Sequence, residues 1–199
     1  MVKQLQVMLF IFAVYWAVLA ISPTNRIQWL MENLLLVAAV TLLLCTYRRF
    51  QFSMISYWFI FVFLCFHAYG AHYTYQGTPF DAWLKGTFHT HRSYYDRVVH
   101  FLFGLFWTYP AREWLTRVTA VRKGIWSYVL PVTIVFGFSS LFEIIEMIAA
   151  LVAGQAGQEY VGMQGDPFDS EKDMGLGLAG AALSMCILGW KRHREPAAD

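Results

Sequence analysis

Long apolar runs, separated by short polar segments, follow one another along almost the whole chain. Six such runs cover residues 5–22, 29–46, 55–73, 98–114, 126–153 and 174–190. Each is close to the ~20 residues that a helix needs to cross the hydrocarbon core of a bilayer. The pattern predicts an all-α, polytopic transmembrane bundle of six helices, which forms a single integral membrane domain over residues 1–199.

The composition supports the same class of protein. Hydrophobic residues make up 58% and charged residues 14% of the 199 residues, which is more apolar than a soluble domain requires for its core. The first run follows Lys3 and is longer than the apolar part of a secretory signal peptide, so we predict a retained helix. The expected surrounding is therefore the lipid bilayer.

Lysine and arginine are unequally divided between the two sides of the predicted bundle. The side that holds both termini also holds Arg48, Arg49, Arg122 and Lys123. By the positive-inside rule we expect the termini to be cytoplasmic, and the loops 72–97 and 154–173 to face the periplasm or the exterior. The net charge is only +2, and the basic residues are not interleaved with aromatic ones, so no nucleic acid partner is expected. Aromatic residues within 77–95 predict an interfacial segment.

Ionisable residues gather toward the predicted periplasmic ends of the runs, and charge at membrane depth usually marks function. Asp96 and His100 are four residues apart and therefore share one helix face. They could bind one ion or one proton. The structural alternative is an aspartate stabilised by the helix dipole beside a hydrogen-bonded histidine.

The fifth run contains two carboxylates, Glu143 and Glu146, on one helix face. Two like charges this close in a low dielectric cannot both stay ionised unaided, so they share a proton or meet a cation. The structural alternative is a neutral pair that hydrogen-bonds to neighbouring helices.

Further candidates flank the third and sixth runs. Asp169 and Asp173 share a face if the last helix begins near Pro167. His67 and His72 are five residues apart, so they need an unwound helix end to reach one ligand.

Small residues over 175–180 match the spacing of a dinucleotide-binding motif, but this segment is apolar and follows no strand. Small residues in a membrane helix instead let helices approach closely. We expect this approach to bring Asp173 toward Glu143.

Four segments together resemble a known family. They read GAHYTY at 70–75, YDRVVHFLFG at 95–104, EIIE at 143–146 and GMQGDPFDSEKDM at 162–174. This order and spacing is similar to that of the YjdF-like family of bacterial inner-membrane proteins, from about the second helix to the sixth. The resemblance implies a location and an architecture, and implies no reaction. A looser similarity is to VanZ-like membrane proteins, although Glu146 stands where that pattern has Gln and Asp173 where it has Asn.

The leading hypothesis is a metal-centred site that opens to the periplasmic side. The predicted metal ligands are Asp96, His100, Asp173, Asp169, His67 and His72, and the predicted catalytic carboxylates are Glu143 and Glu146. Imidazole and carboxylate donors suit a divalent transition metal such as Zn, Mn or Fe. A metal-activated water would attack a lipid or lipid-linked substrate, whose anionic headgroup Arg92 and Arg97 would hold.

Two other hypotheses use the same residues differently. The buried acids could couple protons or a cation to a small transporter, with Pro131 and Gly137 loosening the fifth helix. Six helices make a thin transporter, so this requires a homodimer. Alternatively, the polar residues could fix the bundle of a non-catalytic membrane assembly protein.

Overall fold

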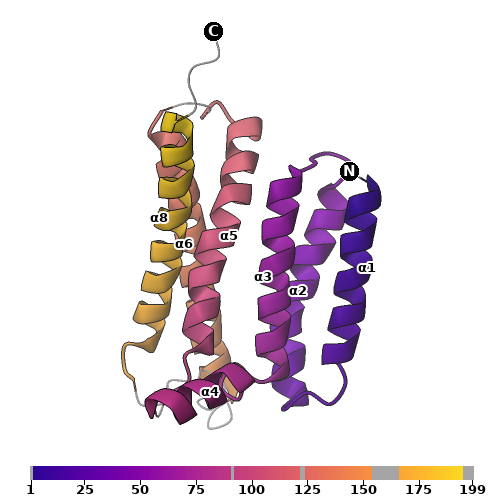
Figure 1. Ribbon diagram of the computed structural model, residues 1–199, viewed down its shortest axis with the longest axis vertical. Coiled ribbons are helices and arrows are strands. Elements are labelled where there is room, and N and C mark those ends of the chain that lie inside the picture. Colours follow the sequence, from indigo (N-terminus) through magenta and orange to yellow (C-terminus); the bar gives the residue numbers. More distant parts are fainter. Residues whose placement is uncertain (1, 91, 122–123, 154–165, 195–199) are drawn as a thin grey trace.

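A computed structural model describes residues 2–90, 92–121, 124–153 and 166–194. Within these ranges the chain forms seven helices (Figure 1). Their bounds are α1 (Val2–Leu19), α2 (Arg26–Thr46), α3 (Met54–His72), α4 (Pro79–Phe88), α5 (Tyr95–Val118), α6 (Trp126–Ala153) and α8 (Asp169–Arg194). The predicted all-α class is confirmed, and the long helices match the predicted apolar runs to within about five residues at each end.

Five of these helices, α1, α2, α3, α6 and α8, are long and apolar enough to cross a membrane. Helix α5 has 24 residues, but the charged residues near its two ends lower its mean hydropathy. The chain is therefore a multi-pass helical protein of the lipid bilayer. The count of six spans and the cytoplasmic side of the termini stay predictions.

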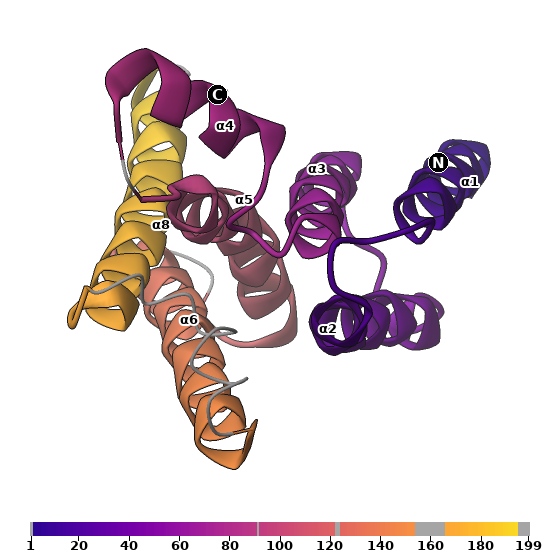
Figure 2. The ribbon, with the colours of Figure 1, turned by 90° about the horizontal axis from the view of Figure 1, so that it is seen from below.

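The long helices form two groups that lie side by side (Figures 1 and 2). Helices α1 to α3 form the first group, α5, α6 and α8 form the second, and α3 packs against α5 between them. The short helix α4 lies across one end of the bundle. Thr78 caps α4 and Pro79 begins it, while Trp83 and Phe88 are exposed, as an interfacial segment requires.

Large aromatic side chains hold the first group together and join it to α5. The ring of Phe63 on α3 lies 5.5 Å from that of Phe103 on α5, and Phe12 on α1 is buried in the same cluster. Between α1 and α2, Trp16 Nε1 donates a hydrogen bond of 2.5 Å to Asn33 Oδ1. Contact here depends on interlocking side chains of large volume.

Backbone contact, by contrast, joins α5 to α8 in the second group. A Cβ atom on Gly104 would collide with the carbonyl oxygen of Gly177, and one on Gly180 would collide with that of Phe101. Ala181 beside them is fully buried. The expected close approach of the small residues on α8 is thus present, and α5 is the partner.

Helix α4 also fixes where α5 begins. The buried carboxylate of Asp81 accepts hydrogen bonds from the backbone N–H of Tyr94 at 2.6 Å and of Tyr95 at 3.2 Å. Thr78 donates to the other oxygen of Asp81 at 2.8 Å. A carboxylate in this position satisfies N–H groups at the start of a helix that would otherwise have no acceptor.

Candidate functional site

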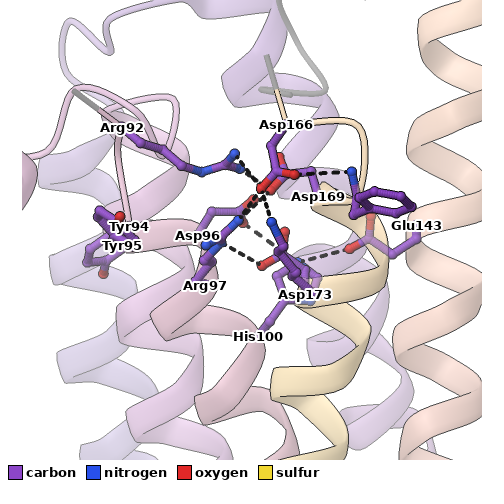
Figure 3. Close-up of polar contacts among 12 residues, drawn as sticks. Arg92, Tyr94, Tyr95, Asp96, Arg97, His100, Glu143, Asp166, Asp169 and Asp173 are labelled. Carbon is purple, nitrogen blue, oxygen red and sulfur yellow. Dashed lines mark hydrogen bonds and ion pairs between the residues drawn. The ribbon is translucent and has the colours of Figure 1, made fainter. Parts of the chain in front are cut away.

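Charged side chains meet at the end of the α5–α6–α8 group that lies nearest α4 (Figure 3). We call these residues the charged cluster. They are Arg92, Asp96, Arg97, His100, Glu143, Asp166, Asp169 and Asp173. The antiparallel course of α5 and α6 brings the first turns of α5 to the last turns of α6, and the first turn of α8 joins them.

His100 lies between two carboxylates. Its Nε2 is 3.2 Å from Glu143 Oε1 and 3.7 Å from Asp96 Oδ1. His100 and Glu143 are buried, each 6% exposed, whereas Asp96 is more open to its surroundings. The four-residue spacing predicted that Asp96 and His100 share a face, and the structure adds Glu143 from α6. A buried imidazole in contact with a carboxylate can hold or release a proton.

The two arginines hold the aspartates at the start of α8. Arg97 Nη2 is 2.9 Å from Asp166 Oδ2 and 3.3 Å from Asp169 Oδ1, and its Nε is 3.9 Å from Asp173. Arg92 contacts Asp166 at 3.2 Å and also pairs with Asp169. Shared pairing of this kind fixes the position of the start of α8 relative to α5.

Asp166 lies outside the helices and is the most strongly paired acid of the charged cluster. Lys172 Nζ donates to its Oδ2 at 2.6 Å, and Arg97 and the backbone N–H of Phe168 also donate to its carboxylate. These hydrogen bonds, that of Lys172 first, lower the pKa of Asp166 to about 2.

Two buried oxygen atoms in or beside the charged cluster, Asp173 Oδ1 and Ser139 Oγ, have no hydrogen-bond partner among the residues that the structure describes. A third, Glu143 Oε1, lies 3.2 Å from His100 Nε2 but forms no well-aligned hydrogen bond with a described residue. A buried polar atom without a partner costs free energy unless it is protonated, hydrated or in contact with a ligand. Protonation or hydration would satisfy these three atoms.

The remaining candidates lie outside the contacts of the charged cluster. Glu146 is within electrostatic range of Asp96 and Glu32, and it is the second carboxylate of α6, after Glu143. His67 Nε2 contacts the carbonyl oxygen of Glu32 at 3.1 Å. His72 Nδ1 contacts the carbonyl oxygen of Leu19 at 2.7 Å. Both histidines thus bind backbone atoms, and the structure does not bring them together on one ligand.

The donor atoms do not have the arrangement of a metal centre. Over residues 2–90, 92–121, 124–153 and 166–194, no group of three or more His, Cys, Asp or Glu side chains could hold a metal ion. Arginine and lysine already hold Asp166 and Asp169. The arrangement therefore gives no support to the predicted metal site, and we derive no chemical step through a metal.

The sequence interpretation missed two residues that shape this end of the molecule. Tyr75 is partly buried, and its hydroxyl lies 2.7 Å from His67 Nδ1. Desolvation of this hydroxyl first, and then the nearby Glu32, raise its pKa well above the usual value. Asp81 sets the start of α5. Tyr75 could have been singled out because it belongs to the segment 70–75, one of the four that carry the family resemblance. Asp81 could have been found from its position three residues after Thr78, a spacing that is typical of a helix N-terminus.

Comparison with known proteins agrees with this architecture. Residues 4–195 match a family described as predicted membrane protein (DUF2238). The chain is 33% identical over 168 residues to the inner membrane protein YjdF of Escherichia coli K12, which covers 84% of this chain and 80% of that protein. No solved structure matches the chain. The predicted YjdF-like resemblance and the location in the bacterial inner membrane are confirmed, and the chain belongs to the DUF2238 family of membrane proteins.

Proposed function

We propose that the charged cluster is an acid–base site for a membrane-resident substrate that carries an anionic group. The contact of 3.2 Å between His100 Nε2 and Glu143 Oε1 carries this proposal. Both side chains are buried, and Glu143 Oε1 forms no well-aligned hydrogen bond with any described residue. A buried proton donor and acceptor in contact are suited to general acid–base catalysis.

The reaction class that we propose is hydrolysis of a lipid or lipid-linked compound. His100 accepts a proton from water while the water oxygen attacks the substrate. Glu143 in its protonated form then gives a proton to the departing oxygen, and Glu146 on the same helix is the alternative donor. Such proton transfers typically contribute about 10² to 10⁴ in rate.

Arg92 and Arg97 are the proposed binding residues for the anionic group. Guanidinium groups bind carboxylates and phosphates in the same planar geometry. A substrate phosphate or carboxylate therefore competes with Asp166 and Asp169 for these two arginines. Release of the aspartates loosens the start of α8 and opens the cluster from the α4 side.

The proposal includes an orientation. We propose that α5 also crosses the bilayer, that both termini are cytoplasmic and that the charged cluster faces the periplasm. Arg48, Arg49, Lys191 and Arg192 lie at the end opposite the cluster, which supports this orientation by the positive-inside rule.

A proton- or cation-coupled transporter is the second candidate. Buried Arg112 and Ser127 at the opposite end of α5 and α6 favour it, because a pathway needs polar groups across the membrane. The backbone contact at Gly104 opposes it, since α5 and α8 leave no passage there. A transporter of this size requires a homodimer, and a non-catalytic assembly role requires only that the cluster be intact.

The test compares the lipids of membranes that contain equal amounts of wild-type protein, His100→Gln or Glu143→Gln. We expect wild-type protein to change the abundance of one anionic lipid species, as measured by mass spectrometry of extracted lipids. Turnover of that species should fall at least about 100-fold in both variants. His193→Gln and Glu171→Gln, which change exposed residues of α8, are the matched controls and should behave as wild type.

Equal lipid profiles for wild type and both variants would refute hydrolysis, and proton-dependent flux into vesicles lost in the same variants would favour transport instead. Elemental mass spectrometry on protein purified without chelator tests the predicted Zn, Mn or Fe centre. A stoichiometric metal lost in Glu143→Gln would restore the metal-centred hypothesis.

A further inference from the structure

Arg112 is a buried arginine at the end of the bundle opposite the charged cluster. It lies six residues before the end of α5, or about 9 Å along the helix axis. Its side chain is 6% exposed. The guanidinium lies over the ring of Tyr128 on α6, 4.9 Å from its centroid.

The hydrogen bonding of Arg112 is incomplete. Its Nη2 donates a long hydrogen bond of 3.4 Å to Ser127 Oγ, and its Nε has no partner within the described part of the chain. Guanidinium has five N–H donors, so the pairing with Ser127 leaves most of its capacity unused.

No carboxylate among the described residues compensates the charge of Arg112 within 4.0 Å. Glu113, the next residue, turns to α3, where it accepts hydrogen bonds from Ser53 and Ser56, and it pairs with Arg117 at 2.8 Å. Arg192 lies in the last turn of α8, at the same end of the bundle as Arg112, and its positive charge acts unfavourably on that of Arg112. The end of the bundle formed by α5, α6 and α8 therefore carries positive charge that no described carboxylate pairs with at Arg112.

This arrangement is unfavourable for a protein without a ligand. A charge at membrane depth is costly unless it is paired, and a second positive charge raises the cost. An anion between Arg112 and Arg192 would remove the repulsion and would use the free N–H donors. Tyr109 and Tyr128 are near enough to Arg112 to interact with it electrostatically, and the hydroxyl of a tyrosine can donate a further hydrogen bond.

We propose that Arg112 and Arg192 bind the phosphate group of an anionic phospholipid at this end of the bundle. Basic pockets between membrane helices on the cytoplasmic side bind anionic headgroups. Planar guanidinium groups match a phosphate diester, and the adjacent exposed Ile125 and Trp126 are suited to contact acyl chains at the interface. This site lies at the other end of the bundle from the proposed hydrolase site and does not depend on it.

The experiment measures the melting temperature of the full chain in detergent by tryptophan fluorescence. The probes are short-chain phosphatidylglycerol, phosphatidylcholine of the same chain length, and inorganic phosphate. We expect phosphatidylglycerol to raise the melting temperature of wild-type protein by at least about 3 °C. We expect neither other probe to do so.

Arg112→Gln should abolish the shift, and Arg192→Gln, a change at an exposed position, should reduce it without affecting the fold. Arg117→Gln is the matched control and should keep the full shift, because Arg117 is exposed and pairs with Glu113. Without lipid, Arg112→Gln should melt no lower than wild type, since it removes a charge that has no counterion.

An equal shift in wild type and Arg112→Gln would overturn the proposal, and so would equal shifts with the two lipids. A rise in melting temperature with inorganic phosphate alone would assign the site to free phosphate and would overturn the proposal that it binds a phospholipid. Glu195 lies outside the described residues. If Glu195→Gln and Arg112→Gln destabilise the lipid-free protein equally, the counterion is internal and the proposal fails.

Discussion

The two helix groups of this protein are held together by different means. Helices α1 to α3 interlock through large aromatic side chains, such as Phe12 and Phe63, whereas α5 and α8 meet through glycines with their backbones in contact. The charged cluster belongs wholly to the α5–α6–α8 group and the segments before it, whereas the first group buries one carboxylate, that of Glu32 on α2.

This difference assigns separate roles to the two groups. Side chains that interlock tolerate small shifts, because other rotamers can fill the space. A backbone contact has no such freedom, because no change of rotamer can relieve a collision with backbone atoms. The rigid contact lies one to two turns from His100 and Asp173, and it sets the distance between α5 and α8 on which the charged cluster depends.

The largest effect is expected from a side chain at the backbone contact. Gly104→Val places three carbon atoms where Gly177 now lies, and α5 and α8 must separate. We expect a loss of about 3 kcal/mol or more in the free energy of unfolding, measured by SDS titration in detergent.

The control for this variant is Gly175→Ala on α8, because a Cβ at Gly175 meets nothing within 4 Å. Its effect should stay within about 1 kcal/mol. If Gly104→Val and Gly175→Ala lower the free energy of unfolding by the same amount, the backbone contact does not stabilise the α5–α6–α8 group.

An intermediate effect is expected in the aromatic group. Phe63→Ala removes a buried ring from between α1, α3 and α5. Lipid tails solvate apolar side chains as well as the protein interior does, so only packing is lost. We expect about 2 kcal/mol by the same titration, below the roughly 3 to 5 kcal/mol that is usual in water-soluble cores.

Phe138→Ala is the matched substitution, because Phe138 of α6 is 61% exposed. It should change the free energy of unfolding by less than about 0.5 kcal/mol. A cost for Phe138→Ala as large as that for Phe63→Ala would show that the ring of Phe63 contributes no specific packing.

The smallest effect concerns pH. The pKa of Asp166 is about 2 in the folded protein and near 3.9 in an unfolded chain. A lowered pKa contributes stability that is present above about pH 4 and is lost as the pH falls toward 2. Between these values the melting temperature of wild-type protein should fall more steeply than that of Asp166→Asn. Parallel curves would show that the contacts of Asp166 with Lys172 and Arg97 do not stabilise the fold.

The periodicity of the sequence was sufficient to predict the long helices and part of the charged cluster. Spacing along one helix predicted that Asp96 and His100 share a face, and the small residues at 175–180 predicted a close approach of α8. The first prediction depends only on spacing within one helix, and the second depends only on the small size of the residues at 175–180. The apolar run begins at residue 98, and the spacing of Asp96 and His100 extended the predicted helix to Asp96, close to its observed start at Tyr95. The sequence did not show that Asp81 of α4 would accept the N–H groups at this start.

Relations between helices could not be predicted in the same way. The sequence contains both the arginines at 92 and 97 and the aspartates at 166, 169 and 173, but it does not say which will pair. Pairing depends on how α8 sits against α5, which the glycines determine. For the same reason the histidines at 67 and 72 were predicted as ligands, although backbone carbonyl oxygens of α1 and α2 are their partners.

The glycine contact between α5 and α8 also has a consequence for biogenesis. The ribosome makes α5 and α6 before α8, so His100 and Glu143 enter the membrane while Gly104 still has no helix against it. Until α8 is made, His100 can pair with Glu143 of α6 but not with the aspartates of α8, and Gly104 has no backbone against it. A nascent chain that stops before Gly177 therefore lacks the contact that fixes the geometry of the charged cluster.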